Sequence, residues 1–184
     1  MASELRVDRI VPTGGVPAGG GGAIIQVVQA VKSDAETLNG STVETLIPGM
    51  EATITPKFSS SKILVMVVLN AKVGPSYAAQ YAVLKRGTNN ICVGDAAGNR
   101  NRASISLQSP PFYDDNAGGN WGPGQASLHY LDSPNTTDPV TYGLYHAEAD
   151  GDGNALYVNR SNNDLDTVSY NRVTSSITLM EVSA

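Results

Sequence analysis

The chain has 184 residues, enough for one domain of ordinary size, and its 12 Lys and Arg against 17 Asp and Glu give a net charge of −5. Nucleic-acid binding needs an excess of positive side chains to neutralise phosphates, so this balance argues against that class of protein. Charged residues make up 16% of the chain, below the roughly 25% of ordinary domains. We therefore expect part of the surface to be covered by copies of the same chain; an exterior rich in Ser, Asn, Thr and Gly is the alternative.

The sequence also predicts where the protein is made. The N-terminal residues MASELRVDRI carry charges where a signal peptide needs an apolar core, and no apolar stretch is long enough for a membrane helix. The single cysteine, Cys92, excludes an internal disulfide. We expect a protein made in the cytoplasm, without membrane insertion, and no motif predicts a cofactor.

The first 22 residues differ from the rest of the chain. Residues 4–11 alternate between apolar and charged side chains and predict a short strand, whose apolar members are Leu5, Val7, Ile10 and Val11. Residues 11–22, VPTGGVPAGGGG, contain too much Pro and Gly to pack a core, which is typical of a linker or an extended arm. We divide the chain into an N-terminal arm, 1–22, and a β domain, 23–184.

From residue 23 onward the chain reads as short strands separated by Gly, Pro, Asn and Asp, and no segment shows a convincing helical period. Pro48-Gly49 predicts a turn between two of these strands. The pattern predicts an all-β protein, an antiparallel β-sandwich or jelly roll. The predicted strands are 23–32, 43–47, 50–55, 62–73, 79–86, 90–94, 103–108, 125–132, 140–149, 154–160 and 173–182.

The most apolar of these strands contains the unbroken run from Ile63 to Leu69, ILVMVVL. It is rich in β-branched residues and too short to span a membrane, so it predicts a strand at the centre of the sandwich. Neither of its two faces is polar enough for water. One face can fill the core, and the other needs cover from a loop, the N-terminal arm or a neighbouring chain, which favours an oligomer.

The least strand-like stretch is 109–124, SPPFYDDNAGGNWGPG, whose paired prolines exclude a central strand. It carries Phe112, Tyr113 and Trp121, the only tryptophan of the chain. Long loops on a rigid sandwich are common binding sites, and aromatic faces stack on sugars. We expect these three residues to contact a receptor or another ligand.

The segment Asp150-Gly-Asp152-Gly-Asn154 begins like a calcium-binding loop, because it places oxygen ligands at alternating positions. The sixth position is Ala155 instead of Gly, and the twelfth is Ser161 instead of Glu. A hairpin turn built on Asp-Gly is therefore favoured, and no metal site is predicted.

Two other groups of side chains suggest chemistry only weakly. Asp114 and Asp115 could form a glycosidase pair with Glu148 and Asp150, although exposed acidic turn residues are the simpler interpretation. The two histidines, His129 and His146, each sit in an alternating strand beside a tyrosine, without the Cys or Glu pattern of a metal site. They favour exposed or interface positions, and a pair stacked near a symmetry axis would sense pH.

Three groups of segments carry a family resemblance. They are 5–32, LRVDRIVPTGGVPAGGGGAIIQVVQAVK; 54–67, ITPKFSSSKILVMV, with 83–104, VLKRGTNNICVGDAAGNRNRAS; and 131–160, LDSPNTTDPVTYGLYHAEADGDGNALYVNR, with the final SSITLMEV. Together they resemble a family of tailed-phage virion proteins of the tail-fibre type, common in phages of marine and cyanobacterial hosts. The resemblance covers nearly the whole chain, but residues 109–124 depart from it.

The resemblance implies a homotrimeric β-sandwich, similar to the trimeric jelly-roll heads of the TNF type, on the outside of a phage particle assembled in the host cytoplasm. The arm would bind another virion protein through Leu5, Val7, Ile10 and Val11, adding a strand to a sheet edge. We expect a non-enzymatic short tail fibre or fibre tip that trimerises and contacts the host surface, with a host glycan as a further partner. A capsid decoration protein and a glycan-degrading sandwich enzyme are the alternatives.

Overall fold

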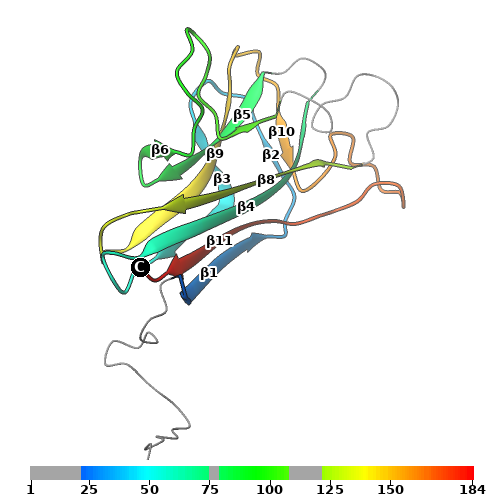
Figure 1. Cartoon of the computed structure of the whole chain (residues 1–184). Coiled ribbons are helices and arrows are strands. Elements are labelled where there is room, and N and C mark those ends of the chain that lie inside the picture. Colours follow the sequence, from blue (N-terminus) through cyan, green and yellow to red (C-terminus); the bar gives the residue numbers. More distant parts are fainter. Residues whose placement is uncertain (1–21, 75–78, 108–121) are drawn as a thin grey trace, which may run out of the picture.

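The computed structural model describes residues 22–74, 79–107 and 122–184, which form two antiparallel sheets that pack face to face (Figure 1). The six-stranded sheet contains β1 (Ile24–Lys32), β2 (Glu36–Leu38), β4 (Lys62–Val73), β8 (Gly124–Asp132), β10 (Leu156–Val158) and β11 (Ser175–Val182). The five-stranded sheet contains β3 (Thr45–Ile54), β5 (Gln80–Arg86), β6 (Asn89–Ile91), β7 (Ile105–Ser106) and β9 (Val140–Glu148). None of these described segments forms a helix of the length and hydropathy that crossing a membrane would require.

The strand order is that of a jelly roll. In the larger sheet β1 lies beside β11, β11 beside β4, and β4 beside β8, while in the smaller sheet β3 lies beside β9, β9 beside β5, and β5 beside β6 and β7. Most successive long strands along the chain belong to opposite sheets, which is how a jelly roll winds its two Greek keys. The predicted all-β sandwich is confirmed; the additional strands β2 and β10 extend the larger sheet beyond the end of β11.

Strand β4 is the centre of the larger sheet, and its bounds are those predicted from the apolar run. It pairs with β11 and β10 along one side and with β8 along the other. Its odd-numbered side chains from Ile63 to Val73 are 0% exposed and belong to the same buried cluster as Leu84, Tyr142 and Leu144 of the opposite sheet. Burial of branched apolar side chains on both sheets forms one continuous core.

One turn prediction is wrong. Pro48-Gly49 does not separate two strands, because β3 runs from Thr45 through both residues to Ile54. The pairing of β3 with β9 shifts register between Leu46 and Glu51, so the two residues form a bulge within one strand. Strand β3 lies at the edge of its sheet, where a proline's missing N–H costs no ladder bond, and Gly49 takes a positive φ of 77°.

A buried polar network joins the ends of several strands at Asn159. Its side-chain amide donates hydrogen bonds to the carbonyl oxygens of Lys32 (2.8 Å) and Asp34 (2.9 Å). Its side-chain oxygen accepts one from the hydroxyl of Ser175 (2.7 Å), and that hydroxyl accepts one from the backbone N–H of Asn70 (2.9 Å). The loop after β1, the end of β10, β4 and the start of β11 are therefore fixed to one another.

Candidate interaction surfaces

The outer face of the six-stranded sheet carries a broad apolar surface. The strand registers place Val27 of β1 beside Met180 of β11, Met180 beside Leu64 of β4, and Leu64 beside Leu131 of β8. Residues directly opposite one another in antiparallel strands point to the same side of the sheet. Four apolar side chains thus form a continuous row across four strands.

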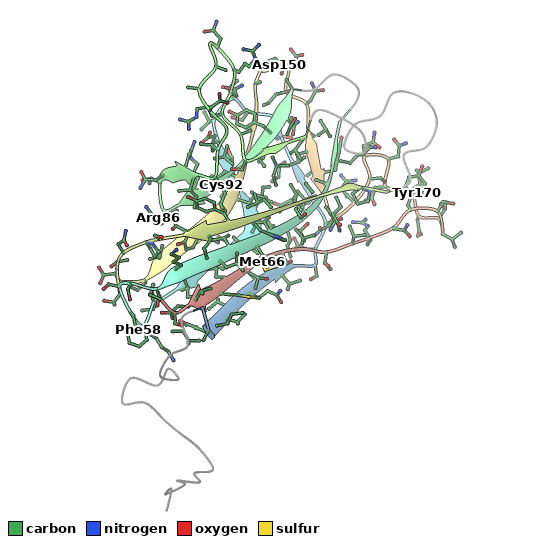
Figure 2. The ribbon with its side chains drawn as sticks, in the orientation of Figure 1. Phe58, Met66, Arg86, Cys92, Asp150 and Tyr170 are labelled. Atoms are coloured by element: carbon green, nitrogen blue, oxygen red, sulfur yellow. The ribbon has the colours of Figure 1, made fainter. Side chains whose placement is uncertain are left out.

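Further apolar side chains flank this row on the same side of the sheet. Met66 lies in the middle of β4, where Figure 2 labels it, and Ile24 pairs with Val182 at one margin. We call the whole set the apolar face; its members are Ile24, Val27, Val31, Leu64, Met66, Val68, Leu131, Met180 and Val182.

The apolar face is exposed at its two sides and partly covered in its middle. Ile24, Val27 and Val31 on β1 are 55 to 56% exposed, and Leu131 on β8 is 48% exposed. The members on β4 and β11 are partly buried by these flanking side chains. The second face of the central strand is thus only partly exposed, and the large aliphatic groups that meet solvent lie on the outer strands β1 and β8. What covers this face stays a prediction.

Neutral polar groups complete the apolar face. Beside its central row lie Gln29, Thr178 and His129 in one row and Ser176 and Ser127 in the next. The amide nitrogen of Gln29 donates a hydrogen bond to the hydroxyl of Thr178 (2.8 Å), so this pair is internally satisfied. None of these residues is an acid, a lysine or an arginine; Lys62, beside Val182, stands at one margin, and Arg172, which lines a pocket with Val68 and Ser176, stands at another.

The outer side of the five-stranded sheet has the opposite character. The Lys85 ammonium lies 2.7 Å from a carboxylate oxygen of Glu44 and 4.7 Å from the centroid of the Tyr145 ring. The side-chain amide of Asn90 donates to the same carboxylate at 3.2 and 3.3 Å. The two outer sides of the sandwich therefore suit different partners.

A polar groove of about 430 Å³ lies on this charged side, between the start of β5 and the loop that connects β6 to β7. Its lining residues are Tyr81, Asn99, Arg100, Asn101, Ala103 and Ser106. Burial and the nearby carboxylate of Glu44 raise the pKa of Tyr81, so its phenol keeps its proton at neutral pH. The connecting loop (green) projects at the top of the sandwich in Figure 1.

The calcium-like segment is organised around a protein carboxylate. Glu148, at the end of β9, is 1% exposed and accepts hydrogen bonds from the backbone N–H groups of Gly153 (2.8 Å) and Asn154 (3.0 Å). Asp150 and Asp152 are exposed. Glu148 therefore holds the turn from within, but the expected hairpin does not form, because β9 belongs to the five-stranded sheet and β10 to the six-stranded one, and the segment connects the two sheets. In the described part of the chain no group of three or more His, Cys, Asp or Glu side chains is placed to hold a metal ion.

The same geometry separates the carboxylates considered for catalysis. Glu148 is buried and bonded to backbone N–H groups, whereas Asp150 points to solvent from the turn above it. Asp114 and Asp115, the other half of the predicted glycosidase pair, lie outside the described residues. Among the described residues, Glu148 has both carboxylate oxygens bonded to backbone N–H groups, which fits a structural role better than a catalytic one.

The two histidines do not come together. His129 is exposed on β8 at the outer face of the larger sheet, and His146 is 1% exposed on β9 in the other sheet. Burial lowers the pKa of His146, and its Nδ1 atom has no hydrogen-bond partner among the described residues. The expectation that both are exposed or interface residues is wrong for His146, which is a buried neutral side chain.

A second buried acid is also structural. Asp132 accepts hydrogen bonds from the Tyr142 hydroxyl (2.7 Å) and from the Arg86 guanidinium (2.8 Å), linking β8 to both β9 and β5. Burial, followed by the bond to Asp132, raises the pKa of Tyr142 well above its usual value. The group closes the open side of the sandwich with all three polar side chains satisfied.

Two sets of predicted site residues fall outside the described residues. They are the receptor-contact residues Phe112, Tyr113 and Trp121, and the arm residues Leu5, Val7, Ile10 and Val11. Their roles, and the division of the chain at residue 22, stay predictions.

Sequence analysis missed the polar groove and most of the apolar face. Alternation within 23–32 places Ile25, Val27, Gln29 and Val31 on one side of a strand. The structure keeps the last three together, but a register shift between Ile24 and Gln26 puts Ile24 beside Val182. The row formed with Met180 and Leu131 depends on strand register, which a single sequence does not specify. The groove brings Tyr81 to a loop about twenty residues later in the chain, and no local pattern signals that contact.

Comparisons with known proteins give distant similarities only. No protein-family model matches the chain, and no curated protein matches it. Among solved structures, the chain is similar to the VP2 subviral particle of infectious bursal disease virus, with 8% identity, a TM-score of 0.38, and coverage of 86% of this chain and 37% of that one.

Two structures of strains of the same virus are also similar to the chain. The Gx strain gives 10% identity and a TM-score of 0.41 over 98% of this chain and 43% of that one, and the Gt strain gives 10% and 0.37 over 86% and 37%. The chain thus spans less than half the length of these proteins. A likeness at this identity and TM-score carries no information on function.

Proposed function

We propose that this chain is a non-enzymatic structural protein of a virus particle, which associates with copies of itself through the apolar face and contacts the host surface. The observation that carries the proposal is the row from Val27 to Leu131, four apolar side chains across four strands with both ends about half exposed. Water contact with so many aliphatic groups is unfavourable, and patches of this kind usually mark interfaces.

A second copy of the chain fits this surface better than a charged partner does. The apolar face contains no acid, lysine or arginine, so a partner with charged groups would bury them unpaired. Another copy brings the same aliphatic rows and the same neutral hydroxyl and amide groups. Because the chain carries a net charge of −5, a neutral interface also keeps most of the like charges of neighbouring copies apart.

The finer assignment rests on the family resemblance of the sequence. It supports a homotrimer, and a short tail fibre or fibre tip as its place on a phage particle. The arm, residues 1–22, would attach the trimer to another virion protein through Leu5, Val7, Ile10 and Val11. A capsid decoration protein would share the same fold and the same interface, and only its position on the particle differs.

The oligomeric state tests the interface. Light scattering at micromolar concentration is expected to give the mass of a trimer for the unaltered chain and of a monomer for Val27→Glu, because the substitution places a carboxylate in the apolar row. Val43→Glu is the matched control, since Val43 is 70% exposed but precedes β3 in the other sheet. A monomeric unaltered chain, or a stable trimer of the Val27→Glu variant, would contradict the proposal.

The position on the particle tests the virion role. An antibody against the chain is expected to label the tail of intact particles in electron micrographs, whereas labelling over the head would identify a decoration protein. Removal of residues 1–22 is expected to abolish incorporation into particles while leaving the trimer intact. Incorporation at the normal level without the arm would show that attachment uses another part of the chain.

A further inference from the structure

The polar groove combines three kinds of group that ligands use. Tyr81 contributes an aromatic ring, Asn99 and Asn101 contribute amides, and Ser106 contributes a hydroxyl, all around one opening. Its volume of about 430 Å³ falls within the roughly 300–1,000 Å³ of ordinary ligand sites. Tyr81 pairs with Ser106 across β5 and β7, so two walls of the groove stand on strands and not on loops alone.

Among the described residues, the positive charge of the groove has no carboxylate partner. Arg100 lines it, and the only acceptor that its guanidinium meets among the described residues is the carbonyl oxygen of Ala97 (3.2 Å). Arg102, next in the same loop, donates through Nε to the carbonyl oxygen of Gly94 (2.7 Å). Within the described residues neither arginine has a carboxylate partner, unlike Arg86, Arg160 and Arg172.

The described acid that acts on Tyr81 does not cancel this charge. Glu44 lies close enough to Tyr81 to affect its pKa, but its carboxylate is already 2.7 Å from the Lys85 ammonium and accepts bonds from Asn90. The acid of the loop itself, Asp95, is exposed and does not line the groove. Arg100 therefore retains most of its donors for a ligand.

We infer that this groove binds an acidic polysaccharide, with Arg100 pairing with a carboxylate or sulfate group and the Tyr81 ring packing on a sugar. A guanidinium holds such anions through two parallel hydrogen bonds, and amides and hydroxyls match the hydroxyl groups of sugars. Aromatic rings supply apolar contact to the flat side of a sugar ring. Nucleic acid fits less well, because a phosphate backbone needs a row of cations and the chain is acidic overall.

This inference deepens the host-contact part of the proposed function and rests on it, since acidic glycans are a chemistry that a cell surface can offer to a virus particle. It places the contact on described residues of the five-stranded side, away from the apolar face. Self-association and glycan binding would then use opposite sides of the sandwich, so both can occur in one assembly.

The test is calorimetric titration of the full chain with four soluble ligands: an oligogalacturonate, a sulfated galactan oligomer, an uncharged malto-oligosaccharide and single-stranded DNA of similar charge. We expect binding of the carboxylated or the sulfated oligomer, with affinity that falls as salt is raised. Whichever of these two binds more tightly identifies the anion. Equal binding of the uncharged sugar, equal binding of DNA, or no binding of either acidic oligomer would overturn the inference.

Variants locate the site. Arg100→Gln is expected to weaken binding at least tenfold, and Tyr81→Ala by a similar factor, while Tyr81→Phe keeps the ring and most of the affinity. Lys57→Gln is the control, because it removes one exposed positive charge from the loop before β4 instead. An equal loss in Lys57→Gln would mean general charge attraction, and unchanged binding in Tyr81→Ala would exclude sugar packing on this ring; either result overturns the inference.

The same titration on Val27→Glu separates the two proposals. If that variant is monomeric and still binds the acidic oligomer, both proposals stand, because the groove lies within one chain. If the unaltered chain forms a trimer but binds no acidic oligomer, the proposed interface stands and only the role of the groove is rejected. Thermal unfolding of each variant shows that the fold is retained, as expected for the exposed Arg100.

Discussion

Asn159 shows how one buried side chain can stabilise several strand ends at once. It sits at φ 60°, in the left-handed region that asparagine tolerates better than most residues, and is 1% exposed. Three of its side-chain hydrogen bonds join segments that are distant in sequence, to Lys32, Asp34 and Ser175. Strands β2 and β10 have three residues each and so form few backbone hydrogen bonds. The Asn159 amide adds side-chain hydrogen bonds that hold the neighbouring segments in place.

Replacing Asn159 by Ala is expected to lower the free energy of unfolding by about 2–5 kcal/mol, because the buried carbonyl group of Lys32 and the partly buried one of Asp34 lose their donor. Asn135→Ala is the matched control: Asn135 has φ 54° but is exposed, and its amide bonds only to the carbonyl of Ser133. Its substitution should cost about 1 kcal/mol or less. Urea unfolding measures both; equal losses would show that backbone conformation, not the network, is decisive.

A second prediction at the residue scale concerns acid. Burial lowers the pKa of His146 in the folded state below its ordinary value of 6.5, so the unfolded chain binds the proton more readily. The stability that depends on neutral His146 is therefore complete above about pH 6.5 and decreases as the pH falls below that value.

Urea unfolding midpoints at pH 7.5, 6.5 and 5.5 measure this dependence, in a range where ordinary carboxylates stay ionised. His146→Gln should reduce the fall in stability between pH 6.5 and 5.5, because glutamine does not titrate. His129→Gln, on the exposed strand β8, should leave it unchanged. If the His146→Gln variant loses as much stability between pH 6.5 and 5.5 as the unaltered chain, the loss must come from other titratable groups.

At the scale of the single element, β4 presents two faces with different tasks. Val67 is 0% exposed in the core, and its neighbour Val68 belongs to the apolar face and is partly exposed. In the monomeric Val27→Glu background, Val67→Ala should cost about 2 kcal/mol or more through the cavity it leaves, and Val68→Ala less than about 1 kcal/mol. In the associating chain, Val68→Ala should instead raise the concentration at which the trimer forms. Equal costs in the monomer would contradict the assignment of the two faces.

The elements that the sequence predicted well are the long strands. In β4, β5, β8, β9 and β11, apolar side chains alternate or run unbroken between turn residues, and local pattern is enough to mark their bounds. Pro48-Gly49 was misjudged because a bulge and a turn use the same residues, and only the edge position of β3 distinguishes them. Strand β2 was not predicted, since three residues bonded to β10 leave no pattern of their own.

For the candidate sites, sequence patterns indicated the kind of surface but not which residues form it. The apolar run predicted a face in need of cover, but the row across β1, β11, β4 and β8 exists only through pairing between residues up to about 150 positions apart. The polar groove has the same origin, because it depends on where the loop after β6 comes to rest against β5. The aromatic residues of 109–124 led to the prediction of a binding loop there, whereas Tyr81 and Arg100 belong to no sequence motif that would predict a site.

On the scale of the whole molecule, the low charge content has an uneven distribution. The central rows of the apolar face have no ion pairs, whereas the other sheet carries Lys85 with Glu44 on its outer side and Arg86 with Asp132 at its rim. A protein with one neutral and one charged side is oriented when it assembles. In the proposed oligomer the neutral sides would face one another, and the charged sides with their grooves would remain outward.

The pairing of β1 with β11 also determines how the domain carries force. The chain enters β1 beside the C-terminal strand. There the backbone N–H of Gly22 donates to the carbonyl oxygen of Ser183, and the N–H of Ser183 donates to the carbonyl oxygen of Ala23 (2.9 Å each). If the arm holds the particle while the groove holds a cell, tension reaches the domain at Gly22. A pull along β1 loads its eight paired positions with β11 together, in shear, while a pull across the sheet opens them one after another. The attachment should therefore resist load along the strand far better than load perpendicular to it.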